Sequence, residues 1–361
     1  MSRNAVSKAV PAVLPSNESP PLSRNVCCTH GVTHATRHTS IAWKSVIIVM
    51  ITLLVYGLSG IASPSAHATD PDARPHVPEN WQWGSGTVDM VLQNRHSLPH
   101  VDDDTCRPSE RRPNPVILLH GTGGTGADFV SHAAALVNDG YCVWAPTYGK
   151  GLTIGGHTFV GGTTSIEHGA ALELSGLIDH VLAVTGARKV DLVGVSLGGV
   201  VATYTTKVHR PDKVDRVVGI ATYGGLGEIM PDMGPLTAAF QGSADFSPFV
   251  AMRELQPDSP FHQRWLGESA SPFVPGVDYT AITSDADGLI PGNLSYVPGR
   301  GLRHIRLQDG CSVNRSSHLT QINDPRAVDA VMSALDPSDI RPLRCIPTDG
   351  LIGPIGPVPP R

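Results

Sequence analysis

A serine between two glycines, Gly194-Val195-Ser196-Leu197-Gly198, has the clearest chemical meaning of any pattern in this sequence. The apolar run before it (190–193) is typical of a buried strand, and the residues after it (197–208) have helical character. Such a strand-turn-helix lifts the serine oxygen above the sheet edge, where the N–H of Leu197 faces a developing oxyanion. The motif therefore predicts that Ser196 is the nucleophile of an acyl transfer. The alternative is a tight turn whose serine only caps the helix.

A glycine-rich loop upstream offers the second N–H donor that an oxyanion needs. This loop, His120-Gly121-Thr122-Gly123-Gly124-Thr125-Gly126, directly follows an apolar run at 116–119. We assign the donor to the backbone N–H of Thr122, with Gly123 as second choice. A phosphate-binding loop is disfavoured, because the Lys-Ser/Thr of a P-loop is missing and the pattern is not G-x-G-x-x-G. We expect His120 to brace the loop rather than to act as a base.

The general base should be a histidine late in the chain, because this arrangement follows the order Ser, then Asp or Glu, then His. His304 lies inside an apolar run at 302–307, where a side chain is more often packed than catalytic. His318 lies in a polar loop, Ser316-Ser317-His318-Leu319, which can bring an imidazole over Ser196. We therefore predict His318 as the base. The alternative is an ordinary surface histidine.

The acid that orients this histidine should follow a strand between Ser196 and His318. The strand predicted at 278–283 continues into a turn that contains Asp285 and Asp287, and both qualify by position. Either could accept the imidazole N–H, fix its tautomer and stabilise the imidazolium. We prefer Asp287, because it lies deeper in the turn and the segment Leu-Ile-Pro follows it closely. The other aspartate would then be a turn former.

Strands and helices alternate along the rest of the chain and would position these loops. This alternation predicts right-handed βαβ units, and so an α/β fold with a mainly parallel sheet and helices on both faces. The expected strands are 116–119, 141–145, 190–193, 214–221, 278–283 and 302–307. The expected helices are 127–138, 165–185, 197–208 and 325–335.

One interruption of this alternation, at about 222–277, is too long for an ordinary connection. It contains glycines, prolines and scattered apolar residues. We interpret it as a lid-like insertion at the active-site end of the sheet. The alternative is a loop that packs permanently against the domain.

Composition and charge exclude some classes of function. The 361 residues are 16% charged, the formal net charge is −5, and the 27 basic residues form no long run, so no nucleic-acid partner is expected. Aromatic residues make up 5%, so the core must consist mainly of Val, Leu, Ile and Ala, which suits buried parallel strands. No Cys/His cluster has the spacing of a zinc site, and neither a metal nor an organic cofactor is expected.

The N-terminal segment 1–68 has the features of an export signal. Residues 1–44 are polar with scattered basic residues, and an apolar stretch follows at 46–61. Ala66-His67-Ala68 then provides a small-x-small cleavage site before Thr69. We therefore predict a secreted or cell-envelope protein whose single catalytic domain spans 69–361. A retained membrane anchor is the alternative.

Cysteine usage agrees with export. Four cysteines follow the apolar stretch, Cys106, Cys142, Cys311 and Cys345, and an even number outside the cytosol indicates two disulfides. Proximity in sequence favours pairing the first with the second and the third with the fourth, although four cysteines allow three connectivities. Four buried free thiols are the alternative.

These motifs together resemble the class 2 bacterial triacylglycerol lipases and esterases of the α/β-hydrolase superfamily. The likeness covers roughly 113–346 and rests on five segments: 120–124 (HGTGG), 145–149 (APTYG), 185–194 (TGARKVDLVG), 287–291 (DGLIP) and 318–327 (HL…DPRA). The family's D-x-x-[VI]-P turn supports Asp287 over Asp285, and its late cysteines fit the pairing Cys311–Cys345. Val195 departs from the pattern, because many relatives have histidine there.

The resemblance implies hydrolysis of carboxylic esters, acylglycerols among them, through an acyl-enzyme on Ser196. The expected partners are then a lipid or a small ester and a transient contact with a lipid interface. Two alternatives stand beside this hypothesis. One is an acyltransferase that uses the same triad on a cell-envelope acceptor, and the other is a catalytically silent binding module on the same fold.

Overall fold

The computed structural model describes residues 75–361 apart from 94, 223–249, 256–258, 267–270 and 291–301. In these residues, six strands form one parallel sheet in the order β2-β1-β5-β6-β7-β8. The strands are β1 (Val116–Leu119), β2 (Val143–Trp144), β5 (Val190–Val195), β6 (Val214–Ile220), β7 (Asp278–Thr283) and β8 (Leu302–Arg306). The predicted mainly parallel sheet is confirmed.

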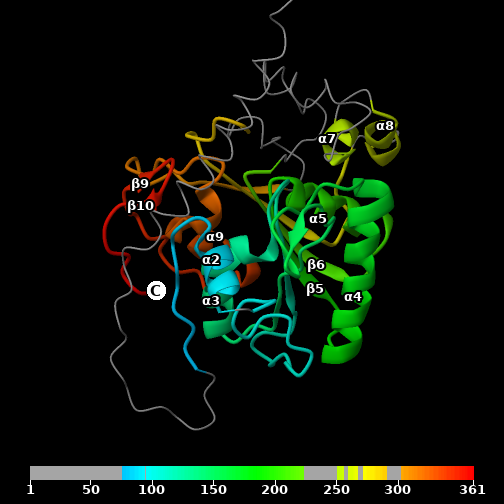
Figure 1. Cartoon of the computed structure of the whole chain (residues 1–361), viewed down its shortest axis with the longest axis horizontal. Helices are drawn as coiled ribbons and strands as arrows, with labels where there is room; N and C mark the ends of the chain where they lie inside the picture. The colour runs from blue at the N-terminus through cyan, green and yellow to red at the C-terminus, as the bar shows by residue number, and fades with distance from the viewer. Residues whose placement is uncertain (1–74, 94, 223–249, 256–258, 267–270, 291–301) are drawn as a thin grey trace, which may run out of the picture. The chain divides into compact units, whose positions relative to one another are not determined.

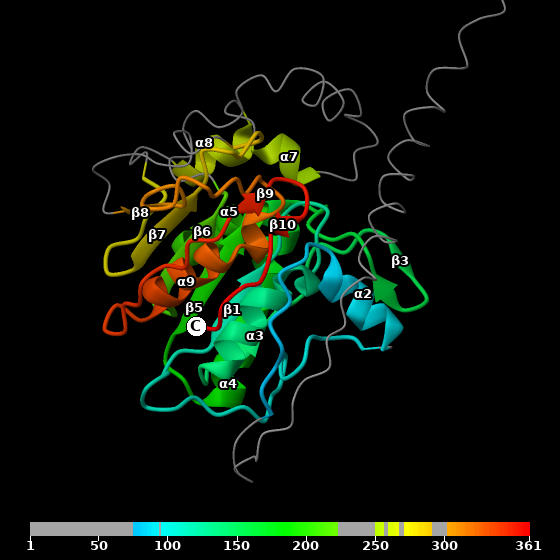
Figure 2. The ribbon, with the colours of Figure 1, turned by 90° about the vertical axis from the view of Figure 1, so that its left-hand side faces the viewer.

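Helices cover both faces of this sheet, as Figures 1 and 2 show. They are α3 (Val130–Asn138), α4 (Ala171–Thr185), α5 (Leu197–Val208) and α9 (Pro325–Leu335). Successive side chains of a strand point to opposite faces. In β1, Ile117 and Leu119 therefore join the apolar core under α4 and α5, whereas Val116 and Leu118 join the core under α3 and α9. The continuous apolar run of β1 fills both layers at once.

The observed boundaries differ from the predicted ones where the backbone departs from ideal geometry. The helix expected at 127–138 begins as a 3-10 turn (Gly126–Phe129), and the one expected at 165–185 begins as a π turn (Ile166–Ala170). The strand expected at 141–145 is shorter, because only Val143–Trp144 pairs as a strand with β1. The helix α9 has the bounds expected, since Asp324 caps it and Pro325 starts it.

Smaller elements complete the described chain. They are α2 (Ser85–Leu92), the hairpins β3–β4 (Thr153–Ile154, His157–Thr158) and β9–β10 (Thr348–Asp349, Gly353–Pro354), the 3-10 turn η4 (Gln321–Asn323), α7 (Val250–Glu254) and α8 (Pro260–Leu266). The predicted signal segment and the first residues of the predicted domain lie outside the described residues. Among those described, no helix is long and apolar enough to cross a membrane.

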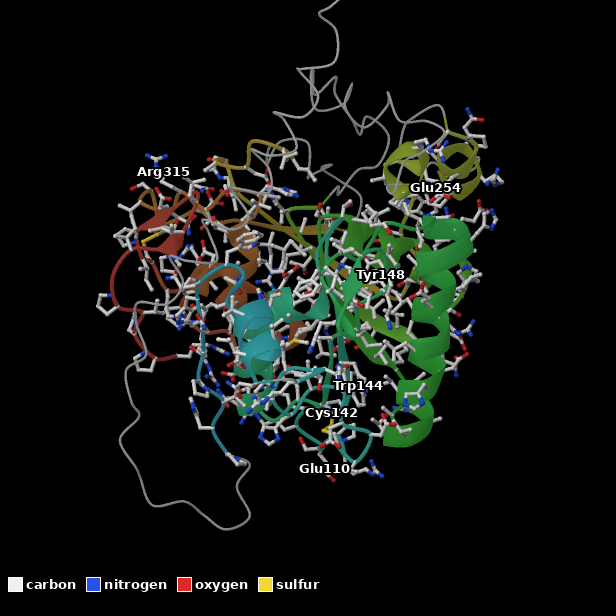
Figure 3. The ribbon with its side chains drawn as sticks, in the orientation of Figure 1. Glu110, Cys142, Trp144, Tyr148, Glu254 and Arg315 are labelled. Atoms are coloured by element: carbon white, nitrogen blue, oxygen red, sulfur yellow. A yellow bond between two sulfur atoms is a disulfide. The ribbon has the colours of Figure 1, made fainter. Side chains whose placement is uncertain are left out.

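The two helices described in the insertion, α7 and α8, pack against the α4–α5 layer. Phe261 and Trp265 of α8 pack against Tyr204 of α5, the first tilted and the second edge-on, with ring centroids 4.9 Å and 5.8 Å away. Glu254 of α7 accepts hydrogen bonds from Ser165 and from the backbone before α4 (Figure 3). The lid interpretation stays a prediction, and 223–249, 256–258 and 267–270 lie outside the described residues.

Two disulfides, Cys106–Cys142 and Cys311–Cys345, join residues 36 and 34 positions apart. This is the pairing that proximity favoured. The first connects the irregular lead-in to the start of β2, and the second connects the segment after β8 to the C-terminal tail. Each closes a loop that would otherwise be free in the unfolded chain, which stabilises the folded state.

A buried arginine joins the lead-in to the ends of two helices. The side chain of Arg112 is only 3% exposed, pairs with Asp139 after α3 and Asp336 after α9, and lies 4.7 Å over the ring of Tyr141. Its neighbour Arg111 is 62% exposed and pairs with Asp139 and Asp339 at the surface. Removing one partner of a buried ion pair leaves an uncompensated buried charge, which destabilises the fold. An exposed ion pair contributes little to stability.

We therefore expect Arg112→Met to lower the free energy of unfolding by about 3–5 kcal/mol. Arg111→Met, the matched control, should lower it by less than about 1 kcal/mol. Urea denaturation of both variants measures the difference. Equal losses of unfolding free energy in the two variants would show that burial does not make the ion pairs of Arg112 more stabilising than those of Arg111.

Candidate active site

Ser196 lies on a strained turn between β5 and α5. Its backbone has φ 53° and ψ −121°, a conformation that residues with a Cβ rarely adopt. The flanking glycines permit it, because a Cβ on Gly198 would lie 1.9 Å from the carbonyl oxygen of Leu119, and one on Gly194 2.3 Å from the carbonyl carbon of Gly198. The spacing Gly-x-Ser-x-Gly is thus required by close backbone packing of the first turn of α5 against the ends of β1 and β5.

The glycine-rich loop after β1 lies directly beside this serine. A Cβ on Gly121 would be 3.1 Å from the Cβ of Ser196. The N–H of Gly123, the second choice for the oxyanion donor, already donates to the carbonyl of Gly161 at 2.9 Å. Leu197 is the first residue of α5, so its N–H lies at the positive end of a helix. The oxyanion roles of Thr122 and Leu197 stay predictions.

His120 is buried inside this loop, and both of its ring nitrogens are used there. Nδ1 donates to the carbonyl of Gly121 at 2.8 Å, and Nε2 accepts from the N–H of Tyr148 at 3.3 Å. The ring stacks on Tyr148, with centroids 4.3 Å apart, and the Tyr148 hydroxyl donates to the His120 carbonyl (Figure 3). Burial lowers the pKa of His120 to about 4, so the ring is neutral at pH 7. These contacts match the bracing role expected.

The structure brings Ser196, His318 and Asp287 together from three separate loops. The Nε2 atom of His318 lies 3.0 Å from the Oγ of Ser196, and its Nδ1 lies 2.9 Å from Oδ2 of Asp287. The His318 side chain is 13% exposed, whereas that of Asp287 is fully buried. A proton can therefore pass from the serine to a histidine whose other nitrogen is held by a carboxylate.

The two candidate aspartates have different environments. Asp287 turns back into its own loop, where Oδ1 accepts the N–H groups of Leu289 and Ile290 at 2.9 and 2.8 Å. The side chain of Asp285 is half-exposed and pairs with Arg306 of β8 at 3.2 Å. Of the two, only Asp287 contacts His318. The backbone N–H bonds fix the direction of its carboxylate.

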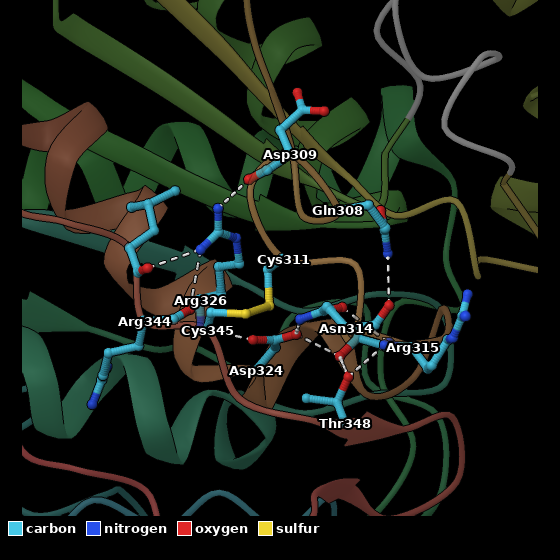
Figure 4. The surroundings of a disulfide bond; sticks show 12 residues. Gln308, Asp309, Cys311, Asn314, Arg315, Asp324, Arg326, Arg344, Cys345 and Thr348 are labelled. Atoms are coloured by element: carbon cyan, nitrogen blue, oxygen red, sulfur yellow. Dashed lines mark hydrogen bonds between the residues drawn. A yellow bond between two sulfur atoms is a disulfide. The ribbon is translucent and has the colours of Figure 1, made fainter.

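The loop that carries His318 is held by a buried polar network below it, shown in Figure 4. Asp324, the N-cap of α9, accepts hydrogen bonds from Asn314 and Ser316 and from the N–H of Arg326. Ser316 also bonds Thr348 of β9. The Cys311–Cys345 disulfide lies beside this network and covalently links the beginning of the loop to the C-terminal tail. The position of His318 therefore depends on buried groups from α9 and the tail.

His304, the other late histidine, lies on the edge strand β8. Its Nε2 is 2.7 Å from the Oγ1 of Thr283 on β7, within the sheet. Burial lowers its pKa. No contact in the described residues joins His304 to Ser196, which agrees with the prediction that it is a packed residue.

Sequence reasoning missed one residue that touches the site. Gln321 donates from Nε2 to Oδ2 of Asp287 at 2.8 Å, the same oxygen that His318 contacts. Gln321 lies three positions after His318, a spacing at which one helical turn brings two side chains to one face. The contact with Asp287 itself has no signal in the sequence. Over the described ranges, no group of three or more His, Cys, Asp or Glu side chains is arranged to hold a metal ion.

Comparison with known proteins agrees with this fold. The chain matches the alpha/beta hydrolase family over residues 116–357, more than half of its length, and therefore belongs to that family.

Three solved structures show the range of similarity. Lipase B of Aspergillus fumigatus is 16% identical with a TM-score of 0.48, over 76% of this chain and 63% of that one, so the match spans less than two thirds of the Aspergillus protein. The mature lipase BlEst2 of Bacillus licheniformis is 15% identical with a TM-score of 0.44, over 65% and 95%. The carboxylesterase CesB of Bacillus subtilis is 16% identical with a TM-score of 0.41, over 70% and 96%.

The buried neutral His120 gives a prediction about acid stability. Its pKa is about 4 in the folded protein and its ordinary value is 6.5, so only the unfolded chain binds this proton between those pH values. Stability contributed by the neutral ring is complete above pH 6.5 and is lost as the pH falls towards 4. We expect His120→Gln to remove about 3 kcal/mol of this pH dependence.

Urea denaturation at several pH values between 4 and 7 measures this difference. The variant can be less stable than the wild type at every pH, because hydrogen bonds are also lost. The test is therefore the slope of unfolding free energy against pH. Parallel curves of unfolding free energy against pH for the wild type and His120→Gln would contradict the view that His120 is buried in its neutral form.

Proposed function

We propose that this chain is a serine hydrolase of carboxylic esters that works through an acyl-enzyme on Ser196. The observation that supports it most directly is the chain of two hydrogen-bond distances at the site. The His318 ring lies 3.0 Å from the serine oxygen on one side and 2.9 Å from the Asp287 carboxylate on the other. A strained nucleophile, a base and a buried acid in this order are the parts that acyl transfer requires.

In the proposed reaction, the Ser196 oxygen attacks the ester carbonyl while His318 takes its proton. The tetrahedral oxyanion is stabilised by the backbone N–H groups of Thr122 and Leu197. His318 then returns the proton to the departing alcohol, and the acyl group remains on Ser196. Water, activated by the same histidine, attacks the acyl-enzyme and releases the acid. Asp287 keeps the imidazole in one tautomer and stabilises its charged form throughout.

We further propose that the chain is a lipase or esterase of the class 2 bacterial type, with acylglycerols among its substrates. Support comes from the motifs around Ser196, Asp287 and His318 and from the glycine-rich loop. We also propose export, with a signal removed near Ala68 and a catalytic domain at 69–361. The two disulfides are compatible with an extracellular protein, since such bonds persist in oxidising compartments.

A covalent label tests the nucleophile. We expect a fluorescent organophosphonate to modify the wild-type protein at one site and to leave Ser196→Ala unlabelled, because the probe mimics the tetrahedral intermediate and needs an activated serine. In-gel fluorescence and peptide mass spectrometry locate the adduct. Labelling of Ser196→Ala at the same rate, or no labelling of the wild type, would refute the assignment.

The two neighbouring aspartates provide a matched pair for the acid. We expect Asp287→Asn to lower kcat for a p-nitrophenyl ester by about 10³–10⁴-fold, because an amide can stabilise the wrong imidazole tautomer. Asp285→Asn removes only a half-exposed pair with Arg306 and should change kcat less than about twofold. Steady-state kinetics of both variants measure which aspartate the reaction needs. A larger loss of kcat in Asp285→Asn than in Asp287→Asn would assign the acid to Asp285 instead.

A further inference from the structure

We propose that Gln321 is a positioning residue that holds the Asp287 carboxylate in the orientation in which it serves His318. This inference rests on the function proposed above. Among the described residues, Gln321 makes no hydrogen bond to Ser196 or His318, and its amide donates to Oδ2 of Asp287 at 2.8 Å. It therefore acts on the reaction through Asp287 alone.

The environment of Asp287 shows why such a donor is needed. Its side chain is fully buried, and among the described residues no lysine or arginine pairs with it. Its charge is balanced by N–H donors, two backbone groups on Oδ1 and the His318 ring and the Gln321 amide on Oδ2. Burial disfavours the charged form of a carboxylate, and each hydrogen bond from a donor offsets part of that cost. Of the donors that the described residues supply to Oδ2, Gln321 is the one that takes no part in proton transfer.

The placement of Gln321 is specific to this contact. The residue is fully buried, and its backbone N–H bonds the Ser317 carbonyl at 3.1 Å, one helical turn back. That turn brings the side chains of His318 and Gln321 within reach of the same oxygen, Oδ2 of Asp287. Within the described chain, the Oε1 of Gln321 accepts no hydrogen bond. The donor side of the amide is the side engaged with the site, through Oδ2 of Asp287 at 2.8 Å.

Removing the donor while keeping the shape tests the inference. We expect Gln321→Met to lower kcat for a p-nitrophenyl ester by about tenfold or more, with KM changed little, because a hydrogen bond to a buried charge is lost. The acid limb of the kcat/KM profile should move to higher pH. The less solvated carboxylate then holds the protonated imidazole more tightly. A purely structural role would not move this limb.

An isosteric carboxyl provides the second variant. In Gln321→Glu, the new group can donate to Asp287 only while it is protonated, and two ionised carboxylates at this distance repel each other. We expect activity to fall as the pH rises through a range in which the wild type is constant. The proton between His318 and Asp287 should also change its downfield NMR position in both variants, and this measurement needs no turnover.

Asn323 provides the matched control. It lies in the same short η4 turn, is equally buried, and its side chain accepts a hydrogen bond from Ser131 at 2.7 Å rather than contacting Asp287. Asn323→Leu should reduce stability and leave both the pH profile and the NMR resonance as in the wild type.

Two outcomes overturn the inference. One is a wild-type pH profile and resonance in both Gln321 variants, and the other is the same change in Asn323→Leu. Failure of the proposed function has a different signature, which is a wild-type protein without esterase activity or an unlabelled Ser196. If the wild type is active and labelled but the Gln321 variants match it, only the role of Gln321 is wrong.

Discussion

The close approach of α5 to the end of β1 is the constraint on which the rest of the site depends. At Gly198, no Cβ could be accommodated, because it would lie 1.9 Å from the carbonyl oxygen of Leu119. This contact holds Ser196 at φ 53°, a conformation that the surrounding packing must impose. The strain costs free energy, and the apolar layers on both faces of β1 and β5 stabilise the fold enough to retain it. The serine oxygen is thereby presented above the sheet edge.

The order of strands in the sheet explains why the loops after β7 and β8 need so much support. β6 lies between β5, which carries Ser196, and β7, which precedes Asp287, while His318 follows the edge strand β8. The His318 loop must therefore reach back across the sheet. It is held by the Asp324 network, by Thr348 of β9 and by the Cys311–Cys345 disulfide. Support from the C-terminal tail thus bears directly on the distance between His318 and Ser196.

Burial divides the polar groups near the site into two kinds. His120 and Asp287 lie under the surface, where hydrogen bonds to neighbouring loops and to η4 hold them, so they fix geometry. Ser196 and His318 keep some exposure, so they can meet a substrate. The buried groups hold the partly exposed ones in place. Such a preorganised site needs little rearrangement during the reaction.

Local features of the sequence alone determined much of this protein. The glycine spacing around Ser196, the alternating strands and helices and the Asp324-Pro325 start of α9 depend on neighbouring residues, so they could be predicted without the fold. Only the tertiary structure decided the short pairing of β2, the packing of α8 on Tyr204, and the contact of Gln321 with Asp287. That contact joins residues 34 positions apart. Its existence depends on how two loops meet in space, which no local propensity or spacing records.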